Sequence, residues 1–350
     1  MFKFNPLTLK QLKRFKTIKR GYYSFIILSI LILISIFAEL LVNNRALLVK
    51  YEGDYYFPTY GSIIPGSTFG QKYEYETNYR QLAKLFEKNE GSNNFVLLPI
   101  VPFNAYENDL KNDSFPPFKP SLEDRHYLGT DKTGRDIVAR LIYGFRIAIF
   151  FSIILLFANY FIGVSIGCMM GYFGGFFDLF FQRIIEIWTN IPYLYAIIIV
   201  SSIVVPNFFS LLGIMAFFGW ISITWYMRTI TYKEKSREYT LAARALGASN
   251  SRIIFKHIIP NTISLIITFI PFSIASAITA LTALDYLGFG LPPPTPSWGQ
   301  LLSEGAEYTI DAIWIGASVI TALVAVLVMV TFIGEAVREA SDPKMHTTYE

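Results

Sequence analysis

The chain has 350 residues, of which 53% are hydrophobic and 17% aromatic, and its formal net charge at pH 7 is +4. This composition is typical of an integral membrane protein and argues against two soluble domains. One cysteine excludes a disulfide framework and a cysteine-rich metal site, and the three histidines lie far apart. We therefore expect no catalytic residue, no cofactor, no metal centre and no nucleic-acid partner.

The N-terminal segment is basic and precedes a long apolar run. Residues 1–21 contain seven Lys and Arg side chains and no acid, and the apolar run extends from about Tyr23 to Val42. A secretory signal is the alternative, but the run is longer than a signal core and lacks a clean small-x-small cleavage site. Roughly 20 apolar residues cross a hydrocarbon core. We predict an uncleaved first span with the N-terminus in the cytoplasm.

Residues 44–138 are polar, rich in Tyr, interrupted by Pro and Gly, and slightly acidic. This composition indicates a small periplasmic lobe packed on the spans, with a helix near Tyr79–Glu87 and a strand near Asn94–Val101. A membrane-anchored enzyme is the alternative. The segment contains neither a nucleophile-elbow motif nor a cluster of histidines, which argues against it.

Further apolar runs predict five more spans, at roughly 147–170, 184–205, 208–227, 262–287 and 312–333. The loop after the fourth span carries seven Lys and Arg against two Glu, whereas the loop after the fifth carries three acids and no base. Both agree with a cytoplasmic N-terminus, and six spans return the C-terminus to the same side. The expected fold class is an all-α polytopic membrane protein with six transmembrane helices.

Two spans carry small residues in patterns that allow close contact. Gly163, Gly167 and Gly171 recur every four residues in the second span, which favours helix packing within the chain over a subunit interface. The fifth span is rich in small and hydroxyl residues and contains Pro271. We predict that it forms a wall of a transport path through Ser273, Ser276, Ala277, Thr279 and Ala280.

The loop at 238–261 is too basic to lie in hydrocarbon. Its first half predicts a short helix with one face formed by Tyr239, Ala242, Ala243 and Leu246. Gly247 is expected to end this helix, Ser249 to cap a second one, and Pro260 to close the second before the next span. Leu241, on the opposite side, suggests a docking partner. A helix lying on the lipid surface is the alternative.

The loop also resembles a known family. Ala242-Ala243, Gly247 and Ile259-Pro260 are similar to the coupling loop of bacterial ABC importer permeases, which docks into a separate ATPase. The resemblance implies an ABC type I importer permease fold with a cytoplasmic coupling helix. It assigns ATPase coupling to Glu238, Leu241, Ala242, Ala243, Arg244, Gly247, Ile259 and Pro260. The chain departs from the family where Leu241 stands for Glu, and Glu238 lies one turn earlier as a substitute.

Other segments extend the resemblance. Leu128–Asp131 followed by Gly134–Asp136 is similar to dipeptide and oligopeptide permeases of the "C" type. We interpret this motif as structural, with Thr133 capping a helix whose third position is Asp136, and substrate contact is the alternative. Leu47–Pro58 is similar to the microcin-C-type branch, as is the Ile-Pro pair at 191–192.

The domain organisation follows from the spans. We expect a cytoplasmic basic tail and first helix at 1–43, a periplasmic lobe at 44–138, a permease core at 139–335 with coupling loop 231–261, and a cytoplasmic tail at 336–350.

The resemblance implies a permease subunit of an ATP-driven peptide importer in the bacterial inner membrane. Its expected partners are a second permease, ABC ATPase subunits, a periplasmic peptide-binding protein and the lipid bilayer. The chain lacks the P-loop signature, so ATP hydrolysis would belong to a partner and the chain is not an enzyme. Alternatives are an importer for another solute, such as nickel or a glycopeptide, and a stand-alone secondary transporter. The latter usually shows acids at the midplane, whereas Asp285 lies near the outer end of the fifth span.

Overall fold

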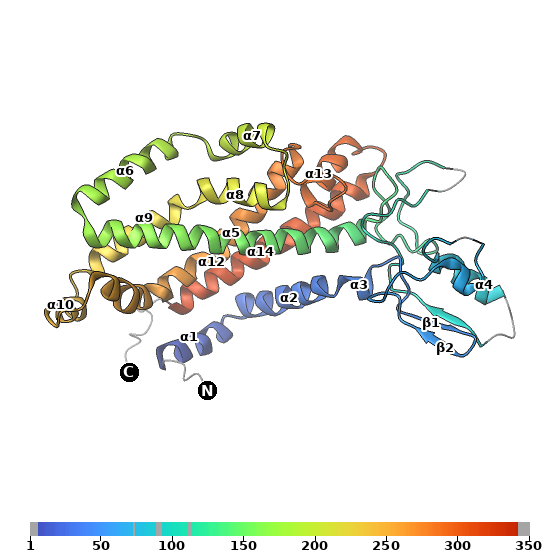
Figure 1. The fold of residues 1–350 in the computed structure, drawn as a ribbon, viewed down its shortest axis with the longest axis horizontal. Coiled ribbons are helices and arrows are strands. Elements are labelled where there is room, and N and C mark those ends of the chain that lie inside the picture. The colour runs from blue at the N-terminus through green and yellow to red at the C-terminus, as the bar shows by residue number, and fades with distance from the viewer. Residues whose placement is uncertain (1–5, 73, 89–92, 111–113, 342–350) are drawn as a thin grey trace.

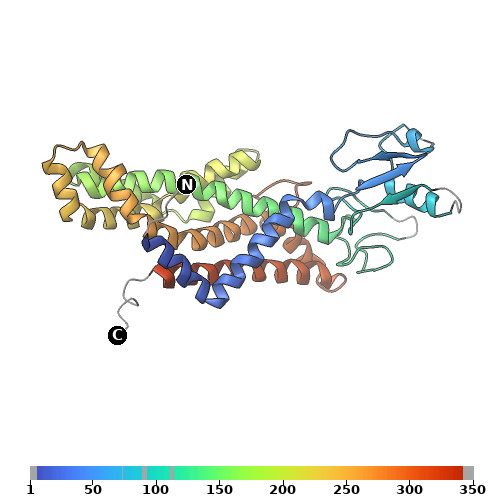
Figure 2. The same cartoon turned by 90° about the horizontal axis from the view of Figure 1, so that it is seen from below.

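The computed structural model describes residues 6–72, 74–88, 93–110 and 114–341. Within these ranges five helices are long and apolar enough to cross a membrane, and a sixth span results if one sharply bent helix pair is counted as a single span. Figures 1 and 2 show an elongated helical bundle with a small lobe at one end, called here the lobe end. Helix α10 marks the opposite end, called here the loop end. The membrane-spanning part of the chain is all-α and polytopic, as its hydropathy predicts.

The basic N-terminal segment is helical rather than an extended tail. Helices α1 (Pro6–Thr17), α2 (Lys19–Ile36) and α3 (Ala38–Leu41) follow one another. The first span therefore begins earlier than predicted and is interrupted at Phe37. It packs along α14 (Ile313–Ser341), where a Cβ added to Gly21 would lie only 2.1 Å from Ala336 Cβ.

The lobe contains a three-stranded antiparallel sheet in the order β2-β1-β3. Its elements are β1 (Leu48–Tyr51), β2 (Asp54–Tyr56), a 3-10 turn at Gly66–Phe69, α4 (Tyr79–Lys88) and β3 (Phe95–Leu97). The predicted helix and strand are thus both present. Val49 lies opposite Tyr56 on one side and Val96 on the other. Its buried side chain joins Phe69, Tyr79 and Leu82 in a separate small core.

The other helices form the membrane bundle and its connections. They are α5 (Ile137–Phe173), α6 (Gly175–Thr189), α7 (Tyr193–Ile203), α8 (Phe208–Gly219), α9 (Ile221–Glu234), α10 (Glu238–Ala245), α11 (Asn250–Arg252), a π-helical turn (Ile253–Ile258), α12 (Ile259–Tyr286) and α13 (Trp298–Glu307). With 37 residues, α5 is roughly 55 Å long. It exceeds the roughly 30 Å hydrocarbon core, so it extends from the bundle into the lobe end.

The glycine stripe of α5 packs within the chain, as predicted. A Cβ at Gly163 would lie 2.6 Å from Trp220 O, and one at Gly167 would lie 2.5 Å from Thr224 O. A Cβ at Gly171 would lie 2.5 Å from Arg228 O. The backbone of α9 therefore lies directly against this stripe, a contact that only small residues permit.

The third span is broken, whereas the sequence predicts a single helix at 184–205. Helices α6 and α7 form an angle of 77° and arch over the bundle (Figure 1). Pro192, which has no N–H, precedes α7 at φ −61° and ψ 121°. Arg183 and Glu186 lie within α6 and pair at 2.5 Å on its exposed side.

Candidate coupling surface and transport cavity

Helix α10 at the loop end is anchored by one narrow edge. Thr240 is fully buried, and its hydroxyl donates to Glu234 O at 2.8 Å. Tyr239 donates to the Glu234 carboxylate at 2.7 Å, and Ala243, one turn beyond Thr240, is also buried. These contacts fix α10 against the end of α9.

The turn after α10 has the predicted glycine geometry. Gly247 has φ +77° and donates to Arg244 O at 3.0 Å, while Ala248 N donates to Ala243 O at 3.0 Å. These two bonds form a Schellman motif, which favours glycine at the left-handed position. Ser249 caps the next helix by accepting from Arg252 N at 3.4 Å.

The four residues predicted to share one face of α10 differ in their exposure. Ala242 is exposed and Leu246 is 88% exposed. Because Leu246 is the C-cap at the start of the Schellman turn, its side chain leaves the buried edge that Thr240 and Ala243 define. Leu241 is half exposed, so an apolar pair, Leu241 and Leu246, projects from the loop end.

Pro260 does not close the second helix, contrary to the prediction. The chain remains helical from Asn250 through Tyr286 because the π-helical turn at Ile253–Ile258 precedes Pro260 at the first turn of α12. A proline cannot complete the ordinary hydrogen bond to the carbonyl four residues earlier, and the wider turn accommodates it. The apolar residues of this turn, Ile253, Ile254 and Ile258, are all buried.

Tyr172 of α5 joins the loop to the bundle, a role that the sequence analysis did not identify. It donates to Asn250 Oδ1 at 2.9 Å and accepts from Arg244 Nη2 at 3.2 Å. Nearby, Arg228 binds both carboxylate oxygens of Asp178 at 2.6 Å. Tyr172 thereby holds α5 to the loop, and the Arg228–Asp178 pair holds α9 to α6.

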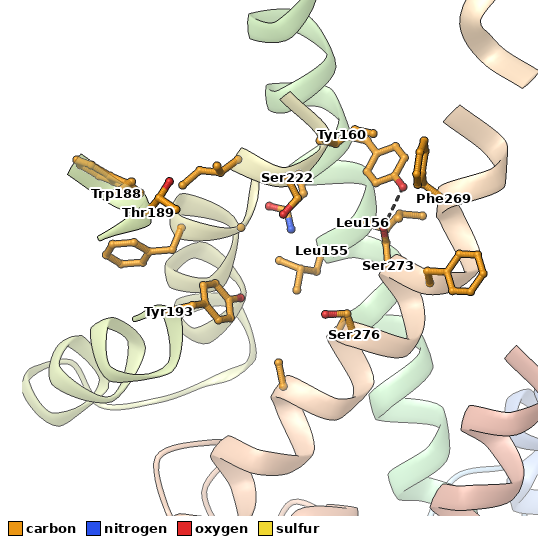
Figure 3. A pocket seen from close by; sticks show the side chains of 18 of the residues that line it. Leu155, Leu156, Tyr160, Trp188, Thr189, Tyr193, Ser222, Phe269, Ser273 and Ser276 are labelled. Carbon is orange, nitrogen blue, oxygen red and sulfur yellow. Dashed lines mark hydrogen bonds between the residues drawn. The ribbon is translucent and has the colours of Figure 1, made fainter. Parts of the chain in front are cut away.

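A cavity of about 540 Å³ lies between α5, the α6–α7 break, the α8–α9 junction and α12. Of the predicted path residues, Ser273, Ser276, Ala277 and Ala280 line it (Figure 3). Thr279 does not, because it is exposed elsewhere on α12 and its hydroxyl donates to Ala275 O at 2.9 Å.

The rest of the cavity wall was not predicted. Tyr160 of α5 pairs with Ser273 at 2.9 Å, and Trp188 and Tyr193 approach from either side of the broken span (Figure 3). Asn159, a polar residue within a long apolar run, also lines the cavity and was the available sequence signal.

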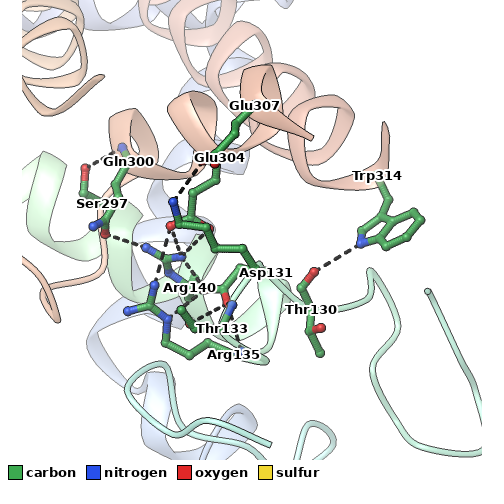
Figure 4. A network of polar contacts seen from close by, with 11 residues as sticks. Thr130, Asp131, Thr133, Arg135, Arg140, Ser297, Gln300, Glu304, Glu307 and Trp314 are labelled. Atoms are coloured by element: carbon green, nitrogen blue, oxygen red, sulfur yellow. Dashed lines mark hydrogen bonds and ion pairs between the residues drawn. The ribbon is translucent and has the colours of Figure 1, made fainter. Parts of the chain in front are cut away.

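A buried ionic network at the lobe end explains the Leu128–Asp136 motif (Figure 4). Arg140 is fully buried and contacts Asp131, while its Nη1 lies 3.2 Å from Glu304 Oε1. Arg135 Nε binds Asp131 Oδ2 at 2.7 Å. Burial by itself raises the pKa of Asp131, but Arg140 and Arg135 outweigh it and lower that pKa below its ordinary value. The network therefore joins the loop before α5 to α13.

The helix cap in this motif differs from the prediction. Asp136, not Thr133, is the N-cap of α5, and its Oδ1 accepts from Ala139 N at 2.8 Å. Thr133 instead donates its hydroxyl to Asp131 at 2.8 Å. Because the chain turns at Gly134, Asp136 retains the extended conformation that an N-cap requires.

His126 lies between two carboxylates beside that cap. Its Nδ1 is 2.8 Å from Asp136 Oδ2, and its Nε2 is 3.2 Å from Asp109 Oδ2. Burial disfavours the charged ring, yet the hydrogen bonds to Asp109 and Asp136 raise the pKa of His126 above its ordinary value. An imidazolium donates from both nitrogens, which matches two acceptors.

Comparison with known proteins agrees with this architecture. A family model described as the inner membrane component of binding-protein-dependent transport systems matches residues 163–347. The chain is 38% identical to the Escherichia coli inner membrane ABC transporter permease protein YejE, covering 98% of this chain and 99% of that protein. It is 35% identical to the Agrobacterium fabrum peptidoglycan transport system permease protein YejE, covering 97% and 94%.

A third relative, the Bacillus subtilis dipeptide transport system permease protein DppC, is 31% identical over 72% of this chain and 78% of its own length. Two of these relatives match along nearly the whole chain, lobe included. The chain therefore belongs to the family of inner membrane components of binding-protein-dependent transport systems.

Proposed function

We propose that this chain is the permease subunit of an ATP-driven peptide importer in the bacterial inner membrane. The observation that carries the proposal is an exposed two-turn helix, α10, held firmly by the bundle at the end remote from the lobe. Relatives named for dipeptide and ABC permease functions support the same assignment.

The coupling role follows from how α10 is held. The buried edge at Thr240 and Ala243 transmits force to α9, while Leu241, Ala242 and Arg244 remain exposed for a partner. Glu238 is also exposed at the start of α10. It can supply the carboxylate that the family carries at the position occupied here by Leu241. Gly247 sets the sharp turn, and Ile259 with Pro260 begins α12 directly beyond the π-helical turn. A push on α10 is thus passed to the two spans on either side of it.

The orientation and partners complete the proposal. The loop end, with its excess of Lys and Arg, faces the cytoplasm together with both chain termini. A separate ATPase docks there, a periplasmic binding protein delivers cargo at the lobe end, and a second permease supplies the other half of the path. Cavity residues Ser273, Ser276, Ala277 and Ala280 then form one wall of that path.

Peptidoglycan is a second candidate cargo, because a relative that aligns over nearly the whole chain is named for its transport. Proteoliposomes that contain this chain, the second permease, the ATPase and the binding protein test both cargoes with labelled oligopeptides and peptidoglycan fragments. We expect uptake that requires ATP and the binding protein. Transport by this chain alone without nucleotide would instead indicate a secondary transporter and refute the proposal.

A further inference from the structure

The third span is broken at the cavity, which also adjoins the junction of two further helices. Residues 190–192 separate α6 from α7, and Ile191 and Pro192 line the cavity together with Gly219 and Ile221 on either side of the α8–α9 junction. Irregular backbone at membrane depth is tolerated where it is buried in protein or lines a cavity. Broken helices also mark the substrate sites of many transporters. The position of the break therefore points to a binding site.

The walls of this cavity are aromatic and polar but uncharged. None of the side chains that line it in the described part of the chain is ionisable at neutral pH. The aromatic residues are Tyr160, Trp188, Tyr193, Phe218, Phe269 and Phe272, and the uncharged polar residues are Asn159, Thr189, Ser222, Ser273 and Ser276. A charged group entering the cavity would lose hydration without meeting a counter-charge from this chain, which is strongly unfavourable.

Asn159 has unused hydrogen-bonding capacity at this site. Its Oδ1 is buried without a partner, and no hydrogen bond to its amide group is present within the described residues. A Cβ at Gly219 would lie 2.6 Å from Asn159 Nδ2. The carboxamide of Asn159 therefore packs directly against the backbone of α8 at Gly219, where a larger residue would not fit. The Nε1 of Trp188, on the same wall, is likewise buried without a partner.

A peptide group is the natural complement of these features. A carboxamide offers a donor and an acceptor, and a main-chain amide offers the same pair in return. Pairing the two would relieve the cost of leaving a buried polar group unsatisfied. The aromatic walls would pack against neutral side chains of the cargo.

We propose that this cavity is a subsite for an uncharged stretch of the cargo, which it recognises by pairing a main-chain amide with Asn159. This inference rests on the proposed function, since it specifies what the peptide path binds. It makes the permease itself selective against charge at one position of the cargo, whichever peptides the binding protein delivers.

Maximal uptake rates in the complete reconstituted importer, at saturating binding protein and cargo, test the proposal. The probes are tetra-alanine, its analogue with an ester in place of the central amide, and tetrapeptides with Asp or Lys at the third position. For Asn159→Leu we expect tetra-alanine uptake to fall by about tenfold, the effect of losing one good hydrogen bond, and ester uptake to fall clearly less. We expect both charged peptides to be slower than tetra-alanine in the unaltered importer.

Asn159→Gln retains the carboxamide and should keep most of the uptake. Thr279→Val is the matched control, because Thr279 lies on α12 outside the cavity wall. Co-purification of the ATPase and the second permease in unaltered amounts shows that the variants assemble. If Asn159→Leu behaves like Thr279→Val, or charged peptides move as fast as tetra-alanine, the subsite proposal is refuted while peptide import stands. If the unaltered importer moves none of the peptides, both proposals fall.

Discussion

The contact between α5 and α9 permits a quantitative test with Gly167→Ala. The added Cβ would lie 2.5 Å from Thr224 O and 2.8 Å from Met227 Cβ. The carbonyl belongs to the backbone and cannot rotate away, so the two helices must separate slightly. Overpacking of this kind costs about 1–3 kcal/mol, and the better helix propensity of Ala returns about 0.5–1 kcal/mol.

The mid-range values, about 2 and about 0.75 kcal/mol, leave a net cost of about 1.25 kcal/mol, which corresponds to a factor of roughly 8 in the population that opens this interface. Cys168 reports that opening, because it is the single cysteine of the chain, is fully buried, and its Sγ lies 3.5 Å from Thr231 Oγ1 of α9. A fluorogenic maleimide should therefore label the variant faster by that factor under native conditions.

Gly213→Ala is the matched control for this measurement. Gly213 is also helical, in α8, but no heavy atom of the described residues outside its own helix backbone and neighbours lies within 4 Å of the added Cβ. We expect its labelling rate to be unchanged or slightly lower. Equal rates for Gly167→Ala and the unaltered protein would refute the inference that backbone contact at the glycine stripe limits this interface.

Three further predictions concern other parts of the chain. Arg140→Ala should lower the free energy of unfolding by about 3–5 kcal/mol, because Asp131 and Glu304 then stay buried without their cation. The unfolding temperature in detergent should fall, and the second substitution Asp131→Asn should restore part of it. An unchanged unfolding temperature would contradict this reason. Because the pKa of His126 is raised in the fold, its stabilisation is present below the ordinary histidine pKa and is lost as pH rises through the raised value. His126→Gln should therefore flatten the fall in unfolding temperature above pH 6.5, and an unchanged slope would exclude this histidine as its source. Gly247→Asp adds a charge and backbone strain at φ +77°, whereas the open space around Gly247 lets the chain still fold. Because only the contact between the permease and the ATPase is altered, ATP hydrolysis should continue while uptake is lost. Normal uptake would contradict the coupling role of this turn.

Features set by local sequence could be predicted. Apolar runs gave the spans, and the four-residue glycine spacing gave a close helix contact within the chain. Gly247 ends a helix through its own backbone conformation, and Ser249 begins one through its hydroxyl, which accepts from Arg252 N three residues later. Such signals are readable without knowing which distant segments meet.

Features that depend on distant segments could not be predicted. Arg140 meets Glu304, 164 positions away, and only the folded bundle brings them together. The break before Pro192 required knowing that a cavity lies beside it, since the apolar run through 184–205 continues across it. The exposure of Leu246 has a local cause instead: Leu246 fits the helical period of α10, but the Schellman turn formed by its neighbours directs its side chain to the surface.

The Leu128–Asp136 motif shows the same limit at close range. Both Thr133 and Asp136 are good caps by composition, and the sequence favours the earlier one because it stands three residues before an acid. The structure selects Asp136 because Asp131 takes the Thr133 hydroxyl and Gly134 redirects the chain. The helix α5 begins after Asp136 because the Thr133 hydroxyl is already bound to Asp131, and not because Asp is a better N-cap residue than Thr.

Disulfide crosslinking in the assembled importer tests the coupling surface most directly. Cysteines would replace Leu241, half exposed on α10 at the loop end, and Ile310, in separate variants. Ile310 is 96% exposed between α13 and the start of α14, where Trp314 binds Thr130 O at the lobe end. The native Cys168 is buried and serves as an internal control. We predict that Leu241→Cys crosslinks to a cysteine-bearing ATPase and that Ile310→Cys does not. Crosslinking of Ile310→Cys alone would place the ATPase at the opposite end and contradict the proposed coupling.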